Sequence, residues 1–575
     1  MRSYLLIALA SLATACATSS KPSDAGFDAG SEDGGDAGSP ADAGFDAGFD
    51  AGSNPYCTQQ QLPTAAFIPD SAGLHRGDIA PDFTLPLFGD GGSWQFSTEF
   101  TGCDSYVFIT DEQTVSSINA TALATTTDWA GLIKQSPPNA HYFFISVNPS
   151  TSGALATNEK VASQIAAALA GSTADQAALW ESKLHVVAGN AQSLAGPIGP
   201  LVTGWGLLGF AIDRQQRYRG VGFLSDVTRY NQATQSDAGW GYLGNLAYAA
   251  NEAIYMNAQA LTQARLDAEG ATVVTLLDGG VVTLVDIDAN LPSASDLEAF
   301  DTLEVEVTQH CPDPTDLEFN SCGAWDYLAS LYVDDPSVPY DPDAGYSYLE
   351  LARFITSYHR ETHWVVDATP MLARLASGGT RHFQWNGSSQ PTGTVVDLRL
   401  SNRSKSYRPE AILPLWTDPG ATFNETYNPD HQPITVNIPA DTKHTELWMI
   451  ITGHGNDANQ CCEFCNHEHQ FTVNDAGFGS DGGSPLVQFP EAGTSDKCIP
   501  EETNGMSPNQ GGTWWYGRGG WCPGEQVDPH VYDVTTLVTP GQSATVTMQG
   551  KFGDGAPPKG GGGDVDLQSM LVTYH

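Results

Sequence analysis

The sequence has few basic residues: 24 Lys and Arg stand against 67 Asp and Glu, and the formal net charge of the 575-residue chain is −43. So little positive charge leaves no basic surface to neutralise phosphates, which excludes nucleic acid as a partner. No apolar run of about 20 residues follows the N-terminal segment, so we expect no transmembrane helix. The chain also lacks a Gly-x-Ser-x-Gly nucleophile motif and a phosphate-binding loop, which argues against those two classes of enzyme.

The first residues have the pattern of a bacterial export signal. Met1-Arg2 precedes an apolar run over residues 5–12, and small residues lead to Cys16. The pattern resembles a lipoprotein signal, so we expect residues 1–15 to be removed. Lipidated Cys16 would then anchor an exported protein to the bacterial outer membrane or cell surface, by lipid alone. The alternative is an ordinary signal peptide with an incidental cysteine.

Residues 16–56 repeat Asp-Ala-Gly and Phe-Asp-Ala-Gly. Such small, acidic sequence cannot bury enough apolar surface to offset the entropy of ordering. It predicts a disordered tether between the anchor and the folded domains.

Residues 57–265 alternate between strand and helix patterns. Residues 106–109 and 142–147 are typical of buried parallel strands, and residues 161–170 of a helix. The segments 77–86 and 210–221 resemble parts of the thioredoxin-like and peroxiredoxin fold. No cysteine occurs at residues 110–115, after the first core strand, where a redox member of that fold carries its reactive thiol. We therefore expect this fold without redox chemistry.

The remainder of the chain has many short strand patterns and almost no helical periodicity, which is typical of antiparallel sandwiches and jelly rolls. The strand patterns at 272–277 and 281–287 flank Asp278-Gly279-Gly280 and predict a hairpin. The length suffices for two units, residues 266–402 and 403–575. The expected fold is thus multidomain: an α/β thioredoxin-like domain followed by two antiparallel β jelly-roll domains, each an all-β sandwich.

With Cys16 lipidated, nine of the ten cysteines remain, and disulfides are expected among them in an exported protein. The pairs close in sequence are Cys311 with Cys322, Cys461 with Cys465, and Cys498 with Cys522. Cys57 and Cys103 could form a fourth pair, which would leave Cys462 over.

Several of these cysteines belong to five short motifs: His310-Cys311-Pro312, residues 322–326, residues 351–358, residues 461–465 and residues 518–524. The second and fourth place Asp326 and Glu463 beside disulfide-forming cysteines. Two carboxylates fixed in this way can share proton transfer, although disulfides with acids nearby are the plainer interpretation.

In this order the motifs resemble the peptide:N-glycosidase F family, from about residue 270 to the C-terminus. Members of that family are paired jelly rolls that cleave the bond between the innermost N-acetylglucosamine and asparagine, converting the Asn to Asp. The resemblance implies a hydrolase of this carbon–nitrogen bond whose partners are N-glycosylated peptides or proteins, and which needs no cofactor.

The resemblance also assigns site residues. Asp326 matches the principal catalytic aspartate and Glu463 a catalytic glutamate that works through water. Arg518 and Trp521 match residues that line the cleft between the jelly rolls. Tyr327 and His454 stand where the family has an arginine and a tryptophan, and with Trp325 we expect them to bind substrate. The family's third active-site acid has no Asp or Glu counterpart at residues 382–387.

Two other functions stay open. The chain could be a catalytically inactive surface lipoprotein that binds glycans or proteins. Whether the chain is such a binding protein or a hydrolase, a set of tryptophans could stack on sugars: Trp325, Trp385, Trp514, Trp515 and Trp521. The other function is a copper- or zinc-dependent monooxygenase-like jelly-roll protein, because His467 and His469, alternate residues on a strand, share one face. Structural histidines are the plainer interpretation of that pair.

Overall fold

A computed structural model gives the fold of most of the chain. It describes residues 55–575 with the following exceptions: 90, 112, 116–117, 121–127, 205–208, 225–229, 232–235, 238–244, 318–320, 336–337, 339–346, 456–461, 475–484 and 562. The proposed signal, Cys16 and nearly all of the tether lie outside the described residues. No helix among the described residues is long and apolar enough to cross a membrane.

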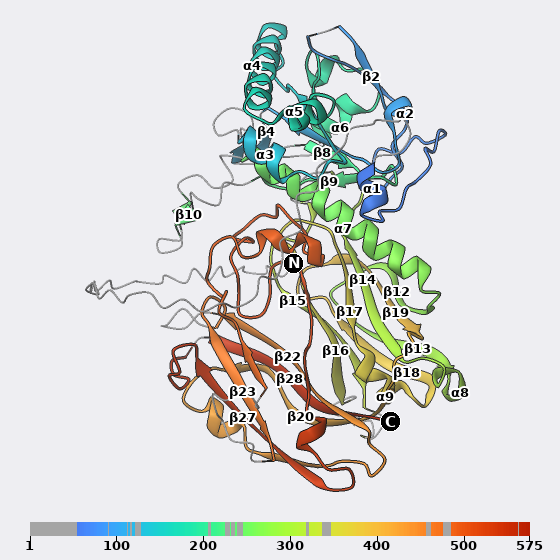
Figure 1. Ribbon diagram of the computed structural model, residues 1–575, viewed down its shortest axis with the longest axis vertical. Coiled ribbons are helices and arrows are strands. Elements are labelled where there is room, and N and C mark those ends of the chain that lie inside the picture. Colours follow the sequence, from blue (N-terminus) through green and yellow to red (C-terminus); the bar gives the residue numbers. More distant parts are fainter. Residues whose placement is uncertain are drawn as a thin grey trace, which may run out of the picture. The chain divides into compact units, whose positions relative to one another are not determined.

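The N-terminal part is built on a mixed five-stranded sheet with the strand order β7-β6-β3-β8-β9 (Figure 1). Its strands are β3 (Ser105–Thr110), β6 (Ala140–Ile145), β7 (Leu184–Val186), β8 (Gly209–Ile212) and β9 (Tyr218–Gly220). β3, β6 and β7 are parallel. β8 runs antiparallel to β3, and β9 runs antiparallel to β8, so that β9 again has the direction of β3. The parallel strands expected at residues 106–109 and 142–147 correspond to β3 and β6, which pair with each other.

Helices accompany this sheet: α3 (Trp129–Gln135), α4 (Thr151–Ala170), α5 (Ala174–Glu181), α6 (Ile198–Gly204) and α7 (Ala249–Ala268). Alternate residues of β3 enter two cores. Val107 and Ile109 pack with residues of α3, α4 and α7, whereas Tyr106 and Phe108 pack with residues of α6. Both faces of the sheet are thus buried, as the continuous apolar runs predicted.

Smaller elements complete this part: α1 (Pro55–Gln59), β1 (Thr84–Pro86), β2 (Ser93–Gln95), α2 (Phe96–Glu99), β4 (Gln113–Val115), β5 (Ile118–Ala120), η1 (Ala191–Ser193), β10 (Tyr230–Asn231), β11 (Ser236–Asp237) and η3 (Leu246–Tyr248). A disulfide joins Cys57 of α1 to Cys103, immediately before β3.

Two antiparallel sheets follow and enclose a common core. One has the order β12-β19-β14-β17 and the other β13-β18-β15-β16-β25. Their strands are β12 (Thr272–Val282), β13 (Leu284–Ser293), β14 (Thr302–His310), β15 (Leu328–Asp334), β16 (Tyr348–Ile355), β17 (Thr362–Asp367), β18 (Gly378–Asn386), β19 (Thr392–Ser401) and β25 (Gln526–Val527). The short helices α8 (Ala294–Leu297), η5 (Thr369–Met371) and α9 (Leu372–Leu375) connect strands. We call this unit the first sandwich.

The expected hairpin at residues 272–287 is wrong. β12 hydrogen-bonds to β19 and β13 to β18, so the two consecutive strands lie in different sheets. Asp278-Gly279-Gly280 lies within β12, where the register shifts twice and Gly279 takes a φ of 76°. A bulge in a long strand uses the same glycine-rich sequence as a turn, and the chain changes sheet only at Thr283.

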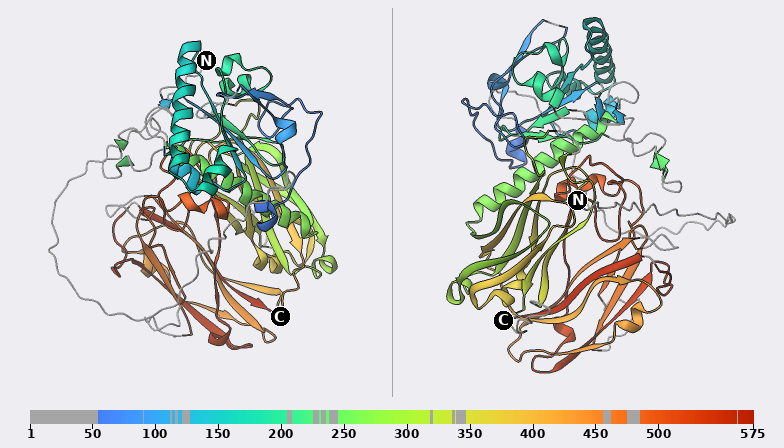
Figure 2. Two further views of the ribbon diagram at one scale, coloured as in Figure 1. Left: turned by 45° about the horizontal axis from the view of Figure 1, so that its top comes forward. Right: turned by 180° about the vertical axis from the view of Figure 1, so that it is seen from behind.

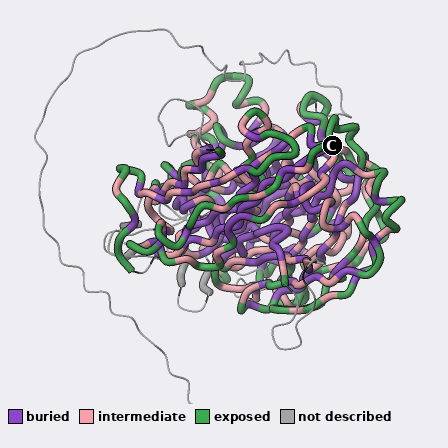
Figure 3. The backbone as a smooth tube through the Cα atoms, turned by 90° about the horizontal axis from the view of Figure 1, so that it is seen from below, coloured by how far each residue is buried: buried purple, intermediate pink, exposed green. Residues whose placement is uncertain are grey.

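The second sandwich consists of the sheets β20-β28-β22-β26 and β21-β27-β23-β24. Its strands are β20 (Pro409–Thr422), β21 (Ile434–Asn437), β22 (His444–Gly455), β23 (His467–Val473), β24 (Leu486–Gln488), β26 (His530–Asp533), β27 (Ser543–Phe552) and β28 (Gly563–Tyr574). α10 (Tyr427–Asp430), η6 (Ile499–Asn504) and η7 (Thr535–Leu537) lie between strands. Figure 3 shows buried residues gathered in the interior of the described chain and exposed residues at its periphery.

The described residues are thus mostly β-structure preceded by a mixed α/β sheet, seen from two further directions in Figure 2. One connection links the sandwiches directly: β25, from the segment between β24 and β26, pairs with β16 of the first sandwich. This segment also carries Arg518 and Trp521.

Candidate active site

Asp326 lies on the turn that enters β15. The disulfide between Cys311 and Cys322 closes the segment before it. The side chain of Gln390 accepts a hydrogen bond from the Trp325 amide at 3.0 Å and donates to the Trp325 carbonyl at 2.7 Å. The hydroxyl of Thr356 donates to that carbonyl at 2.7 Å and accepts from the Tyr327 amide at 2.8 Å. The backbone on both sides of Asp326 is therefore fixed by side chains of the first sandwich.

Glu463 lies between the end of β22 and the start of β23, in the second sandwich. Its amide donates to the Gly455 carbonyl at 3.1 Å, and its carbonyl accepts from the Gly519 amide at 2.8 Å. Cys465, two residues later, is disulfide-bonded. Its expected partner, Cys461, lies outside the described residues. The backbone of Glu463 is thus held by β22 on one side and by the Arg518 turn on the other.

Arg518 brings the two carboxylates together. Its Nη2 lies 3.3 Å from Oδ2 of Asp326, and its Nε lies 3.5 Å from Oε1 of Glu463. The Arg518 side chain is 0 % exposed, against 13 % for Asp326 and 22 % for Glu463. One buried guanidinium therefore connects acids from two sandwiches, and both carboxylates keep a face toward solvent.

The guanidinium is itself anchored. Nη1 donates to the carbonyls of Thr513 at 2.8 Å and Tyr516 at 2.6 Å, and Nη2 donates to the Thr513 hydroxyl at 3.2 Å. The rings of Phe464 and Trp521 each lie with their centroid 5.2 Å from its Cζ, a cation–π geometry. These contacts hold the Arg518 guanidinium in place, so it positions the two acids.

Tyr358, just beyond β16, is a further member of the site. It is 8 % exposed, and its hydroxyl hydrogen-bonds to the side chains of Asp326 and Arg518. Sequence reasoning missed this residue, although it ends the third of the five motifs. The signal available was its place at the end of a strand that neighbours the Asp326 strand.

Burial sets the protonation of the two acids. It raises the pKa of Glu463 to about 7, against an opposing effect of Arg518 and with a contribution from the negative charge of Asp326. Burial also raises the pKa of Asp326, opposed by Arg518 and by the hydrogen bond from Tyr358. A carboxyl group with a pKa near neutrality can exchange protons with water or substrate at physiological pH.

Three of the predicted substrate-binding residues differ in how far their side chains are exposed to solvent. Trp325 and Tyr327 are 55 % and 40 % exposed and, with Pro312, Gln390 and neighbouring residues, line a pocket of about 400 Å³. His454 is partly exposed, stacks on Trp521 at 5.2 Å and hydrogen-bonds to the Thr452 hydroxyl at 2.8 Å. Burial lowers the pKa of His454 to about 3, so the ring is neutral near pH 7.

The other tryptophans proposed for sugar stacking are buried. Trp385, Trp514 and Trp515 are at most 1 % exposed, and Trp521 is 6 % exposed. The indole of Trp521 donates to the Gly453 carbonyl at 2.9 Å and packs against Arg518 and His454. In this conformation only Trp325 of that set offers an open face to a sugar, and Trp521 supports the arginine.

The histidine pair on β23 is a buried hydrogen-bonded unit. His467 Nδ1 lies 2.9 Å from His469 Nε2, and Tyr427 lies 3.2 Å from His469 Nδ1. Added Cβ atoms at Gly453 and Gly519 would meet His467 Nε2 at 2.3 Å and 2.6 Å, so both positions require glycine. Among the described residues, no group of three His, Cys, Asp or Glu side chains is arranged to hold a metal ion. The ring of His467 thus packs directly beneath the turn that holds Glu463.

Changing Tyr358 to phenylalanine tests its contribution. The hydroxyl stabilises the ionised form of Asp326, so its loss raises the pKa of Asp326 further. We expect turnover to fall about tenfold, the effect of losing a hydrogen bond to a charged group, and any Asp326 limb of the pH–rate profile to move to higher pH. The profile of the variant beside the parent checks this. A tenfold loss with an unmoved profile would show that Tyr358 acts by packing only.

The sequence and structure were compared with known proteins. The family model for the C-terminal domain of peptide-N-glycosidase F matches residues 422–572. The peptide-N(4)-(N-acetyl-beta-D-glucosaminyl)asparagine amidase F of Elizabethkingia miricola is 24 % identical over 275 residues, which are 45 % of this chain and 69 % of that protein.

Two solved structures are also similar. The structure of PNGase F, a glycosylasparaginase from Flavobacterium meningosepticum, has a TM-score of 0.40 and 19 % identity, and the match covers 53 % of this chain and 96 % of that one. The structure of PNGF-II has a TM-score of 0.38 and 13 % identity, and covers 64 % of this chain and 74 % of that one. With the family match and the curated relative, the C-terminal region of this chain is peptide-N-glycosidase F-like.

Proposed function

We propose that the chain hydrolyses the amide bond between the innermost N-acetylglucosamine and asparagine of N-linked glycopeptides, with Asp326 and Glu463 as the catalytic residues. The observation that carries the proposal is the shared arginine: one buried, anchored guanidinium holds a carboxylate from each sandwich. The family match at residues 422–572 and the amidase relative support the same reaction.

The chemistry divides between the two acids. Glu463, with a pKa of about 7, accepts a proton from a water molecule as the water oxygen attacks the side-chain carbonyl carbon of the glycosylated asparagine. The carbon–nitrogen bond breaks, and its electron pair goes to the nitrogen. Asp326, whose pKa is also raised, donates a proton to that nitrogen. The products are an aspartate and a 1-amino sugar, and the proton on Glu463 returns to Asp326 through solvent.

The positive charge of Arg518 limits the cost of bringing the acids together. Two carboxylates that share a site cannot both ionise easily, and one of their pKa values rises. Arg518 opposes the rise on both. This balance leaves Glu463 able to work as a base near neutral pH.

We propose that the pocket beside Trp325 and Tyr327 receives part of the glycopeptide. The two aromatic side chains flank Asp326 in sequence and are exposed, and aromatic faces bind sugar rings through apolar contact. Tyr327 carries no charge where the family has an arginine, so contact with the substrate on this side depends on stacking and hydrogen bonding. His454, neutral near pH 7, fits an uncharged part of the substrate on the other side.

The test of the function uses the whole chain and a denatured N-glycopeptide. Hydrolysis converts one Asn to Asp, which mass spectrometry detects as loss of the glycan together with a gain of about one mass unit relative to the unglycosylated Asn peptide. A second peptide with the same sequence and no glycan is the control and should be unchanged. Retained binding of the glycopeptide without any conversion would contradict the hydrolase and leave the inactive glycan-binding protein.

We also propose the organisation of the rest of the chain. The order β7-β6-β3-β8-β9, with β8 antiparallel to the other four strands, supports a thioredoxin-like domain over residues 57–265. The sheets support sandwich domains over residues 266–402 and 403–575. The disulfides fit an exported protein.

The lipid anchor at Cys16 rests on the sequence alone. Labelling of cells with a fatty acid tests it: the parent chain should take up label, and a Cys16→Ala chain should not. Equal labelling of the two would refute the anchor.

A further inference from the structure

Two loops hold the residues behind Asp326. The Tyr358 loop (residues 356–361) joins β16 to β17, and the Asn509 loop (residues 505–512) follows η6 and leads to Thr513, which binds Arg518. Gln510 accepts a hydrogen bond from the Tyr358 amide at 2.8 Å, and the Gly511 amide donates to the Tyr358 carbonyl at 3.3 Å. The two loops therefore form one hydrogen-bonded layer.

This layer is tied to the catalytic turn. The His359 amide donates to the Gly323 carbonyl at 2.7 Å, and Thr356 bonds the backbone of Trp325 and Tyr327. Tyr358 reaches Asp326 and Arg518 through its hydroxyl. A displacement of this layer would therefore displace Asp326, because several hydrogen bonds connect the two.

The other side of the layer rests on the mixed α/β part of the chain. Arg360 of the Tyr358 loop makes a bidentate ion pair with Glu252 of α7, with N–O distances of 2.9 Å and 3.1 Å. It also donates to the carbonyl of Gly220 at the end of β9, at 3.0 Å, and to that of Pro508 in the other loop. The side chains of Arg360 and Glu252 are 9 % and 3 % exposed. A buried bidentate pair of this kind fixes direction as well as distance.

The Asn509 loop makes its own contacts with the same helix. The Asn509 amide group donates to Oε1 of Glu252 and to the Tyr248 carbonyl, both at 2.9 Å. The backbone carbonyl of Asn509 accepts a hydrogen bond from the Phe223 amide at 2.6 Å. A Cβ at Gly222 would lie 2.0 Å from that carbonyl oxygen, so the approach is as close as backbone allows. Glu252 consequently binds both loops at once.

We propose that Glu252 is a positioning residue of the active site, and that the mixed α/β part serves the hydrolase by fixing, through Arg360 and Asn509, the two loops behind Asp326, Tyr358 and Arg518. This role gives the mixed α/β part a function within the hydrolase. The expected effect on kcat rests on the proposed amidase activity. The expected effect on the two loops does not.

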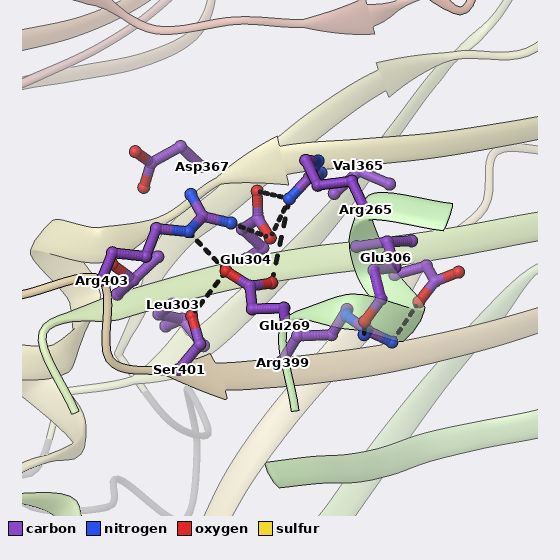
Figure 4. Close-up of polar contacts among 12 residues, drawn as sticks. Arg265, Glu269, Leu303, Glu304, Glu306, Val365, Asp367, Arg399, Ser401 and Arg403 are labelled. Atoms are coloured by element: carbon purple, nitrogen blue, oxygen red, sulfur yellow. Dashed lines mark hydrogen bonds and ion pairs between the residues drawn. The ribbon is translucent and has the colours of Figure 1, made fainter. Parts of the chain in front are cut away.

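The test compares three variants of the whole chain. Glu252→Gln removes the charge that holds both loops. Asn509→Gly removes only the side-chain contacts, because Asn509 has a φ of 52° that glycine adopts readily, so this variant keeps the loop backbone. Arg265→Gln is the matched control: it breaks an ion pair of 3.0 Å between the same helix and Glu304 of β14, roughly 20 Å along the helix axis from Glu252. Figure 4 shows this second cluster, in which Arg265 and Arg403 each lie beside both Glu269, at the end of α7, and Glu304.

We expect Glu252→Gln to lower kcat about 10²-fold, the cost of misplacing catalytic groups by about 1 Å, with KM changed less than about threefold. Asn509→Gly should lower kcat about tenfold, as for one hydrogen bond to a charged group. Hydrogen exchange of the amides in residues 356–361 and 505–518 should speed up in both variants, and exchange in β20 and β28 should not. Arg265→Gln should match the parent in both measurements.

Parent-like kcat and exchange in Glu252→Gln and Asn509→Gly would overturn the inference, and so would loop exchange accelerated equally by Arg265→Gln. If the parent does not hydrolyse glycopeptides, the proposed function fails, while the exchange measurement still decides whether Glu252 holds the loops.

Discussion

Replacing Asp326 by asparagine is expected to lower kcat about 10³-fold, within the range that general acid–base groups contribute. The amide cannot donate a proton to the leaving nitrogen as an acid does. The change is nearly isosteric, and the Tyr358 hydroxyl and Arg518 keep their other partners, Arg518 through Thr513, Tyr516 and Glu463. The fold should therefore survive. Initial rates on a denatured glycopeptide, with the melting temperature of each protein, check this.

Asp288→Asn is the matched control for that variant. Asp288 lies on β13 of the same sandwich, 73 % of its side chain is exposed, and its ion pair with His382 is a surface contact. Such pairs contribute little to stability, so this variant should keep the activity and melting temperature of the parent. An Asp326→Asn protein that is folded and retains more than a tenth of the parental kcat would remove Asp326 from the chemistry.

The convergence of Asp326, Glu463 and Arg518 could be anticipated from the sequence because each lies in a short motif, next to cysteine or glycine, that resembles the peptide:N-glycosidase F family. Disulfides and left-handed glycines restrict the backbone locally, so residues beside them keep recognisable patterns. The pairs Cys311–Cys322 and Cys498–Cys522 are present in the structure as expected. The sequence did not reveal that Arg518 itself would be buried between the acids, since burial depends on both sandwiches at once.

Other features depend on long-range packing and could not be read locally. Trp514 and Trp515 are adjacent, yet both are buried, in a cluster with Met506 and the Cys498–Cys522 disulfide. The sequence does not distinguish a tryptophan in a core from one on a sugar-binding face, because the difference depends on the elements that pack around it. The expected hairpin at residues 272–287 failed for a similar reason, because the strands pair with partners that are 85 to 128 residues away in sequence and not with each other.

Arg360 and Glu252 show the same limit more clearly. They lie 108 residues apart, in what the sequence divides into separate domains. Each alone is an ordinary charged residue on a loop or helix. Only the fold shows that they form a buried bidentate pair behind the catalytic turn.

Replacing Glu463 by glutamine should separate activity from stability. The reaction needs Glu463 ionised and Asp326 protonated, so the kcat/KM of the parent should pass through a maximum as pH changes. One limb of this profile should lie near pH 7, the pKa to which burial raises Glu463. Glutamine cannot accept the proton, so we expect kcat about 10²-fold lower and no limb of the profile near pH 7. Rates measured between pH 5 and 9 on parent and variant check both points.

The same raised pKa gives the sign of the stability effect. The folded state holds the Glu463 proton up to about pH 7, whereas the unfolded chain releases it near the ordinary value of 4.5. The stability contributed by this group therefore falls as pH rises from about 4.5 to 7 and stays low above that. Glutamine is neutral throughout, so at pH 8 the variant should melt at a temperature equal to or above that of the parent, and at pH 4 the two should coincide. If the variant melted well below the parent at pH 8, ionised Glu463 would have to stabilise the fold through its ion pair with Arg518. Glu463 would then be a structural residue and not a catalytic base.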